Sequence, residues 1–428
     1  MKDKPQIFRA WAFYDWANSV YSLVIASAVF PLFYGALFRA VEREYWPIFG
    51  IDIHKTSIIF YTTALAFVVI SVAAPLLSGI ADVLGNKKFF MRFFCYLGAV
   101  SCMGLYFFNL EQIYLSLTLY LLGLIGFWMS IVFYNSYLPD IAERKHHDQL
   151  SARGYAMGYI GSVILLLLCL FMIFNPRLLG FESAAQPTRL SFVLTGIWWI
   201  GFSSYTFKYL PDFKKPGVQL NLSSFFKGFN ELFVTWRRLK NNLLLSKYLT
   251  AFFVYSMAVQ TVMLVATYFG ESEIAWGSDD HRTTGLIVSI LLIQIVAVGG
   301  AILCSKLSYR WGNLNTLILI NFIWILVCVY AYFIEQPVEF YAAAALVGLV
   351  MGGIQSLSRS TYSKLLPETK DTTSFFSFFD VTEKIGIVIG MILYASITQL
   401  TGDMRSAVLF LVVLFALGIA LLFKAKKN

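Results

Sequence analysis

The apolar segment at residues 10–38 carries a carboxylate and an amide among aromatic side chains. Asp15 lies six residues beyond Arg9, about 9 Å along a helix that rises about 1.5 Å per residue. Asn18 follows three residues later, and Tyr14 and Tyr21 lie on an adjacent strip. A carboxylate at such a depth in a membrane costs roughly 2.5–3.5 kcal/mol on insertion scales. Asp15 therefore either bonds a neighbouring helix for packing alone, or lines a cavity wall and senses protons or substrate.

The partner of Asp15 decides between a proton carrier and a gate. Three candidates are Asn18 on the same segment, Arg153 and Lys384. An amide partner leaves Asp15 free to exchange a proton, whereas a close basic partner keeps it ionised and makes it part of a gate.

Four more polar side chains interrupt apolar segments further along the chain. Asn135 ends the segment at 112–138, Gln260 lies within 247–269, and Gln355 lies within 338–358, with Arg359 directly after it. Together with the polar side of 10–38, they are candidates for binding or coupling. Arg359 has two alternatives: its long stem reaches lipid phosphate, or its planar guanidinium binds a carboxylate with two parallel hydrogen bonds.

The elements that hold these residues are long apolar helices. Hydrophobic types make up 58% of the 428 residues and charged types only 13%, about half the charge of a soluble domain. Apolar blocks of about twenty residues match a hydrocarbon core of about 30 Å, and they are too long for barrel strands. We predict an all-α polytopic membrane protein with twelve spans, at residues 10–38, 57–81, 89–109, 112–138, 154–175, 190–210, 247–269, 284–304, 314–334, 338–358, 376–399 and 405–423.

Basic residues predict the orientation. Twelve spans put both termini on one side, and only seven of the 33 Lys and Arg residues fall on the other side. Because cytoplasmic loops carry the excess of Lys and Arg, we expect both termini in the cytoplasm, with a bacterial inner membrane as the location or, alternatively, a vacuolar membrane. The net charge of +9 is spread over short loops, which argues against nucleic acid. We expect a monomer in the lipid bilayer.

The sequence lacks the motifs of several other classes of protein. The five cysteines lie inside apolar blocks without a CxxC pair, so we expect free core thiols and no metal or other cofactor. No G-x-x-x-x-G-K-[ST], HExxH or GxSxG occurs. We predict that the chain is not an enzyme and does not use ATP directly. A secondary transporter of a small-molecule substrate leads, with a non-transporting sensor or scaffold as the alternative.

Two halves of the chain share motifs at one offset. Tyr134 and Pro139 recur as Tyr362 and Pro367, 228 residues on, and glycines at 158 and 161 recur at about 386 and 390. We predict two parallel six-helix halves, at residues 1–210 and 247–428. The basic stretch between them, 211–246, is a cytoplasmic connector on the anionic inner leaflet or a docking site for a soluble partner.

The loop after 57–81 reads SGIADVLGNKK and resembles the G-x-x-x-D-x-x-G-x-[KR] loop of the major facilitator superfamily. Gly79, Asp82, Gly85 and Lys87 carry the likeness, although a serine holds the first position. The resemblance implies that Asp82 faces the start of the segment at 376–399 and holds the cytoplasmic side shut, with Arg153 and Lys384 near that gate. The matching loop of the second half, at 306–312, keeps its glycine but lacks the aspartate, which argues against a symmetric second gate.

A narrower resemblance runs along nearly the whole chain. YDWANSVY at 14–21, YNSYLP at 134–139, GYAMGYIG at 154–161 and GGIQSLSRS at 352–360 are similar to the vacuole effluxer-like family, whose yeast members are autophagy-related amino-acid exporters. The resemblance implies proton-linked transport of an amino acid or short peptide by alternating access, through a cavity lined by the first, fourth, seventh and tenth spans. The family's Tyr-x-Asp-Gly in the seventh span is absent; Tyr255 is followed by Ser-Met-Ala.

Overall fold

The computed structural model describes residues 2–213 and 222–427. Its first half contains α1 (Pro5–Val20), a π-helical stretch at Tyr21–Val29, α2 (Phe30–Ala40), α3 (Lys55–Leu84), α4 (Lys87–Gly104), α5 (Ile113–Asn135), α6 (Leu138–Ile141), α7 (His147–Phe174) and α8 (Ala185–Tyr209). Its second half contains α10 (Leu243–Glu273), α11 (Asp279–Trp311), α12 (Asn313–Phe333), α13 (Pro337–Leu365), α14 (Thr372–Thr401) and α15 (Met404–Lys426).

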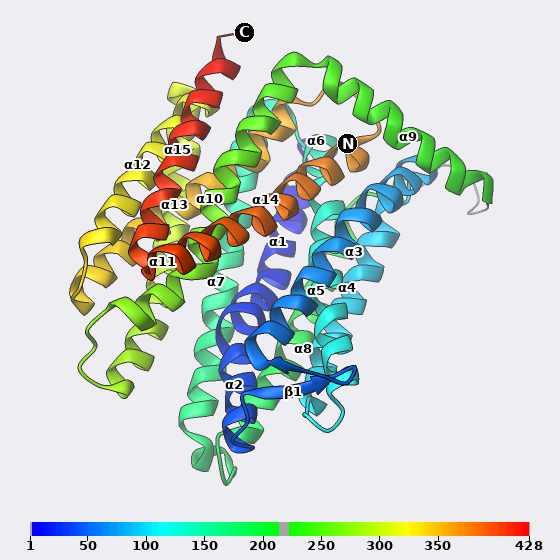
Figure 1. Ribbon diagram of the computed structural model, residues 1–428. Coiled ribbons are helices and arrows are strands. Elements are labelled where there is room, and N and C mark those ends of the chain that lie inside the picture. The colour runs from blue at the N-terminus through cyan, green and yellow to red at the C-terminus, as the bar shows by residue number, and fades with distance from the viewer. Residues whose placement is uncertain (1, 214–221, 428) are drawn as a thin grey trace.

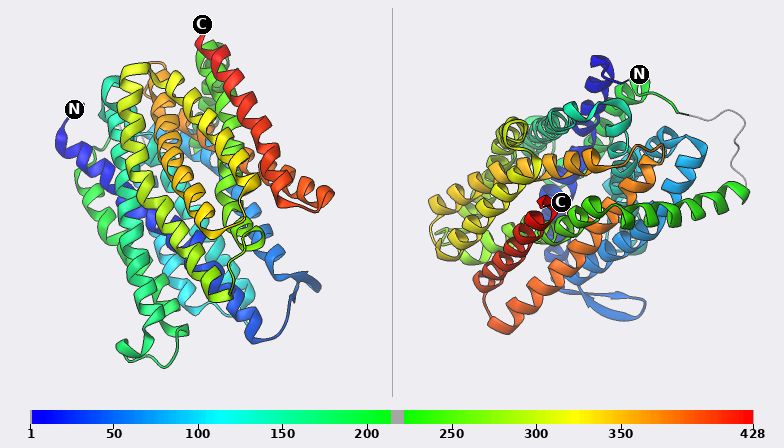
Figure 2. Two further views of the ribbon diagram at one scale, coloured as in Figure 1. Left: turned by 90° about the vertical axis from the view of Figure 1, so that its left-hand side faces the viewer. Right: turned by 90° about the horizontal axis from the view of Figure 1, so that it is seen from above.

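Two helical bundles lie side by side, and both chain ends lie on the same face (Figure 1). One apolar core is built from residues of α1 to α8, and a second one almost entirely from residues of α10 to α15. We call the face with the chain ends the terminal face. The starts of α1, α7, α10 and α14 lie there, together with the ends of α3, α13 and α15 (Figures 1 and 2).

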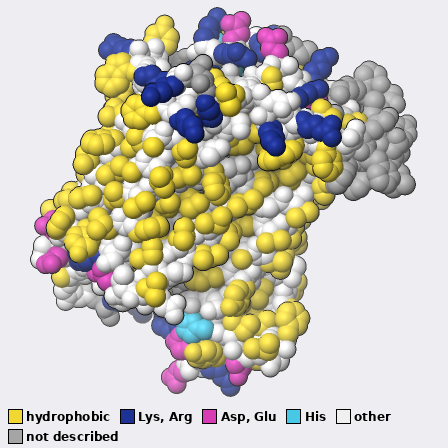
Figure 3. Space-filling view, turned by 45° about the horizontal axis from the view of Figure 1, so that its top comes forward, with side chains coloured by type: hydrophobic (Ala, Val, Ile, Leu, Met, Phe, Trp, Pro, Cys, Tyr) yellow, Lys and Arg dark blue, Asp and Glu magenta, His cyan; other side chains and the backbone are white. Residues whose placement is uncertain are grey.

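The predicted all-α membrane fold is confirmed. Ten helical segments of the described residues are long and apolar enough to cross a membrane, and α8 and α14 run beside them as the other two expected spans. The helices extend past several predicted limits, because they continue beyond the apolar blocks into polar loops. Apolar side chains cover the middle of the molecule, while Lys and Arg gather on the terminal face (Figure 3).

Two elements were not predicted. A short antiparallel hairpin joins β1 (Tyr45–Ile48) to β2 (Ile51–His54) on the face opposite the chain ends. The connector contains α9 (Leu222–Asn241), which packs against α3, α10 and α14 and crosses the terminal face (Figure 1). Lys214 and Lys215, part of the predicted basic stretch, lie outside the described residues. The division at 1–210, 211–246 and 247–428 stays a prediction.

Glycines allow the closest helix contacts in both halves. A Cβ on Gly161 of α7 would lie 2.9 Å from the Trp16 carbonyl oxygen of α1. In the second half, a Cβ on Gly390 of α14 would lie 2.3 Å from Thr261 Oγ1 of α10. The motif glycines that share the offset of about 228 residues therefore serve equivalent contacts, α1 with α7 and α10 with α14.

Candidate functional site

A buried ion pair joins the two halves. Asp15 of α1 and Arg359 of α13 are 6% and 2% exposed, and both guanidinium nitrogens Nη1 and Nη2 lie 3.3 Å from Asp15 Oδ2. We call these two residues the cross-half pair. Of the two alternatives for Arg359, the structure has the carboxylate contact. The partner predicted for Asp15 is corrected: it is neither Asn18, Arg153 nor Lys384, because the end of α13 brings Arg359 across the gap between the halves.

Hydrogen bonds complete the surroundings of the cross-half pair. Tyr134 donates its hydroxyl to Asp15 Oδ2 over 2.8 Å. Arg359 donates to Asn135 Oδ1 over 3.1 Å, and to the Ser151 hydroxyl and carbonyl oxygens over 2.9 and 3.0 Å. The two charges thus balance one another, and every guanidinium nitrogen of Arg359 donates a hydrogen bond, which makes a buried pair tolerable.

The local backbone leaves room for this pair. A Cβ on Gly154 of α7 would lie 2.3 Å from Asp15 Oδ2, so a larger residue there would push the carboxylate away. The rings of Trp11 and Tyr155 lie 4.7 and 4.2 Å from the guanidinium carbon of Arg359. Aromatic faces at these distances stabilise a cation. Sequence reasoning missed Ser151 and Tyr155, since a serine and a tyrosine near a span end are common.

The polar strip predicted on the first span is split by the structure. Tyr14 and Tyr21 are fully buried inside the first half. Tyr21 stacks on Phe127 with ring centres 5.1 Å apart. Asn18, three residues beyond Asp15, is 1% exposed, and its Oδ1 accepts a hydrogen bond from the Ser19 hydroxyl over 3.3 Å. A binding or coupling role for Tyr14, Asn18 and Tyr21 stays a prediction.

A second charged cluster lies on α14. Lys384 is completely buried and donates to Asp380 Oδ1 over 3.1 Å and to Glu383 Oε2 over 2.9 Å. Its ammonium also lies 3.4 Å from the centre of the Trp128 ring of α5. Gln260 of α10 donates to Glu383 Oε1 over 2.8 Å. We call Asp380, Glu383 and Lys384 the α14 cluster. Lys384, predicted at the gate, lies in this cluster instead.

The α14 cluster was the largest omission of the sequence analysis. Three charged residues inside the expected span at 376–399 were a sufficient signal, because charges within spans are rare and functional. The other two predicted residues lie apart from it. Gln355 accepts a hydrogen bond from the Tyr159 hydroxyl over 2.6 Å, which also joins the halves. Arg153 is exposed, so the structure does not bring it to Asp15.

Asp82 caps the start of α14 on the terminal face. Its carboxylate accepts hydrogen bonds from the backbone N–H groups of Thr373 and Ser374 over 3.2 and 2.7 Å, and from the Ser374 hydroxyl over 2.7 Å. This is the contact that the loop resemblance implied, and a carboxylate is favourable at a helix N-terminus. Gly85 ends α3 with φ of 64°, a conformation that glycine adopts freely, and Gly79 is buried one turn before Asp82.

Lys87 ties three segments together beside this cap. It forms an ion pair with Asp140 and donates to the Ser136 carbonyl over 3.0 Å. It also donates to the Thr372 hydroxyl over 3.3 Å. Thr372 belongs to the other half, so Lys87 contacts both halves at the terminal face.

A second carboxylate also joins the two halves at the terminal face, and we call its contacts with Ser308, Asn313 and Lys364 the second cap. The sequence suggested that the loop at 306–312 has no aspartate to offer to the first half. In the structure the aspartate is Asp148, at the start of α7 itself, and it accepts from Ser308 over 3.1 Å and Asn313 over 2.7 Å. Lys364 of α13 forms an ion pair with the same carboxylate. The halves thus have a second contact at this face, but it is not the symmetric gate that the loop at 306–312 argued against, because its aspartate again comes from the first half.

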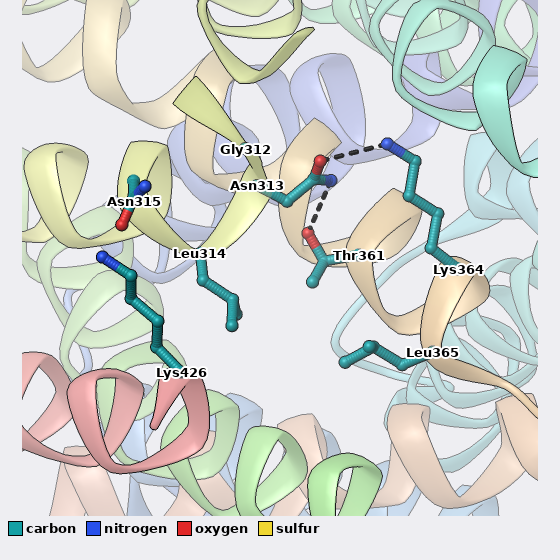
Figure 4. Close-up of a pocket in the computed structure, with 8 residues that line it drawn as sticks. All are labelled: Gly312, Asn313, Leu314, Asn315, Thr361, Lys364, Leu365 and Lys426. Atoms are coloured by element: carbon teal, nitrogen blue, oxygen red, sulfur yellow. Dashed lines mark hydrogen bonds between the residues drawn. The ribbon is translucent and has the colours of Figure 1, made fainter. Parts of the chain in front are cut away.

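A shallow pocket of 260 Å³ lies beside the second cap, among the ends of α12, α13 and α15 (Figure 4). Asn313, Lys364 and Lys426 contribute its polar groups. It lies within the second half, and none of the predicted substrate residues lines it.

Two solved structures of transporters have the same arrangement of helices. The E. coli fucose:proton symporter FucP superposes with a TM-score of 0.67 at 15% identity, over 98% of this chain and 97% of that one. The proton:xylose symporter XylE gives a TM-score of 0.70 at 10% identity, over 98% and 95%. This chain therefore shares the fold of these two symporters, two helical halves that lie side by side.

Sequence relatives are more specific. The "Vacuole effluxer Atg22 like" family model matches residues 3–427. An uncharacterized MFS-type transporter, YxiO of Bacillus subtilis, is 34% identical over 96% of this chain and 93% of its own. Autophagy-related protein 22 of Saccharomyces cerevisiae is 25% identical over 87% and 77%. The chain belongs to the vacuole effluxer Atg22-like family, so the family resemblance is confirmed.

Proposed function

We propose that this protein is a secondary active transporter that moves a small polar metabolite, an amino acid or short peptide, by alternating access linked to protons. The cross-half pair is the observation that carries the proposal. A buried ion pair between α1 and α13 can persist only while the halves are in contact, and each separated charge would then need a new partner.

A zwitterionic solute offers both replacements. Its carboxylate matches the Arg359 guanidinium, and its ammonium matches Asp15. Such a solute would bind where the halves part and would be released when the pair forms again. The family relationship supports the same substrate class. Because Asp15 has a close basic partner, we assign it to the gate and not to proton transport.

The caps of Asp82 and Asp148 hold the terminal face together, and we propose that this face is cytoplasmic because it carries the basic loops. A bacterial inner membrane suits the relationship to the Bacillus protein. Opening this face requires both caps and the contacts of Lys87 to break. An enzyme reporter that is active only outside the cytoplasm, fused after Asn428, should be silent.

Flux measurement tests the function. Purified protein is screened by thermal shift against amino acids, peptides, sugars and vitamins, since a ligand at 100 times its Kd adds about 2.7 kcal/mol of stability. Hits are then followed as radiolabelled solutes in proteoliposomes with and without a pH gradient. Accumulation of an amino acid or peptide supports the proposal. Binding without flux in either direction would favour a sensor or scaffold.

A further inference from the structure

We propose that Asp380 carries the coupled proton, in a site completed by Glu383, Lys384 and Gln260. The first observation is a charge imbalance. Two carboxylates share the single Lys384 ammonium, so the α14 cluster has one negative charge in excess when all three groups are ionised. An uncompensated charge in a membrane span is costly, and one bound cation removes it.

The second observation is an oxygen atom without a donor. Asp380 is 3% exposed, and its Oδ2 has no hydrogen-bond partner among the described residues. A buried carboxylate oxygen that accepts nothing loses its solvation without compensation. A proton on Oδ2 removes the charge and makes that atom a hydroxyl.

The geometry favours a proton over a larger cation. The Lys384 ammonium already occupies the space between the two carboxylates and is covered by Trp128. The Oδ2 atom is enclosed, with almost no accessible surface. A metal ion needs several oxygen ligands around it, whereas a proton needs one lone pair.

Groups from four helices make up or face the α14 cluster. On α14 they are Lys384 and Glu383; elsewhere they are Tyr255 and Gln260 of α10, Trp128 of α5 and Tyr155 of α7. Charged residues of other neighbouring helices lie towards the ends of α14. Asp82 of α3 accepts a hydrogen bond from Ser374 in the first turn of α14. Arg238 of α9 pairs with Asp371, directly before that helix. Arg405, at the start of α15, lies beyond the other end of α14 and bonds Glu273.

Glu383 connects Asp380 with water. Its side chain is 18% exposed and lies one turn from Asp380, and both carboxylates bond the same ammonium. A proton taken up at Glu383 can pass to Asp380 through Lys384, whose ammonium gives one proton to Asp380 and regains one from Glu383, so that Lys384 is charged before and after. No other reactant is required: the carboxylate gains one proton on loading and returns it on release.

The inference rests on the proposed proton linkage, but its test does not need the substrate. Infrared difference spectra are recorded on the full chain in lipid between acidic and alkaline pH. The C=O stretching band of a protonated carboxyl group should appear on acidification. It should be lost in Asp380→Asn, return at a shifted position in Asp380→Glu, and persist in Glu339→Gln, whose carboxylate is exposed.

Three results would overturn the assignment. The band could be absent from the native protein, it could persist unchanged in Asp380→Asn, or it could respond to sodium replacing choline at constant pH. Correct folding of each variant is checked by its thermal unfolding. Failure of the proposed function is a separate result: no solute flux in proteoliposomes, with the Asp380 band still present.

Discussion

The cross-half pair and the α14 cluster are both buried, but they differ in charge and in connectivity. Asp15 and Arg359 belong to different halves and balance one another, and every guanidinium nitrogen of Arg359 donates a hydrogen bond. Asp380, Glu383 and Lys384 lie on one helix of one half, with two acids for one base and one oxygen left without a donor.

The difference separates two tasks of a coupled transporter. A contact that must break and reform between moving bodies needs two complementary surfaces and no titration. A site that must load and release a proton needs a charge that its own surroundings do not balance, and it can remain within one body. On the proposed function, we therefore expect the gate at α1 and α13 and the coupling at α14.

The largest effect is expected for Arg359→Gln. The substitution removes the polar contacts of the guanidinium with Asp15, Asn135 and Ser151. Because breaking one side of a buried pair costs about 3–5 kcal/mol, the detergent-purified variant should unfold at a much lower temperature and show no transport.

A double variant and a matched control sharpen this result. Arg359→Gln combined with Asp15→Asn removes both charges and should recover part of the stability, giving a coupling energy of about 1–3 kcal/mol in a double-mutant cycle. Arg153→Gln, in an exposed position on α7, should unfold like the native protein. Additive losses in the cycle would show that the two residues act independently.

The sequence predicted the helices better than their contacts. Continuous apolar blocks fix the spans, and Asp15, Asn135 and Arg359 stood out because they interrupt such blocks. Spacing along one helix could not reveal that Arg359 reaches across the halves, since that contact depends on how α13 packs beside α7. Spacing along one helix also could not reveal that Tyr14 and Tyr21 pack in the core of the first half. The Asp380 cluster was visible in the sequence but was not identified.

A smaller effect is expected for Asp15→Asn. The amide oxygen can still accept from Tyr134 and Arg359, but these bonds lose their charged acceptor, so we expect a loss of about 1.5–3 kcal/mol in closure of the terminal face. Ser356 of α13 is buried between the halves. Its carbonyl oxygen accepts a hydrogen bond from the Ser151 hydroxyl of α7 over 2.8 Å. A cysteine introduced by Ser356→Cys should therefore react faster with a polar thiol reagent in the Asp15→Asn background.

The five native cysteines are buried, which keeps the background of that experiment low. The matched variant is Asp82→Asn, which weakens the cap at α14. We expect it to shift the balance between the closed and open terminal face by about 1–2 kcal/mol towards the open state, and so to increase the reactivity of Ser356→Cys as well. Equal reactivity in all three proteins would separate both aspartates from the gate and leave them a packing role.

Lys384→Gln should have a different signature from Arg359→Gln. The two carboxylates left behind can share a proton, because like charges at short distance disfavour double ionisation. We expect a loss of stability of only about 1–2 kcal/mol, from the two missing hydrogen bonds, with transport that no longer responds to an imposed pH gradient. Thermal unfolding and counterflow in proteoliposomes give the two readouts. Retained gradient-driven accumulation would contradict the contrast between the clusters.

The smallest effects concern the aromatic ring that faces each cation. Tyr155 covers Arg359 at 4.2 Å and Trp128 covers Lys384 at 3.4 Å, so both clusters use a ring face although their charges differ. Tyr155→Leu and Trp128→Leu should each lower stability by about 0.5–2 kcal/mol, whereas Tyr155→Phe and Trp128→Phe, which keep a ring, should lose less. The charges of Arg359, Asp15, Glu383 and Asp380 all act on Tyr155, so its hydroxyl is the group to test for communication between the two clusters. If Tyr155→Phe keeps native stability but changes the pH dependence of transport, the gate and the coupling site communicate through that hydroxyl. An unchanged pH profile would mean that the clusters work independently.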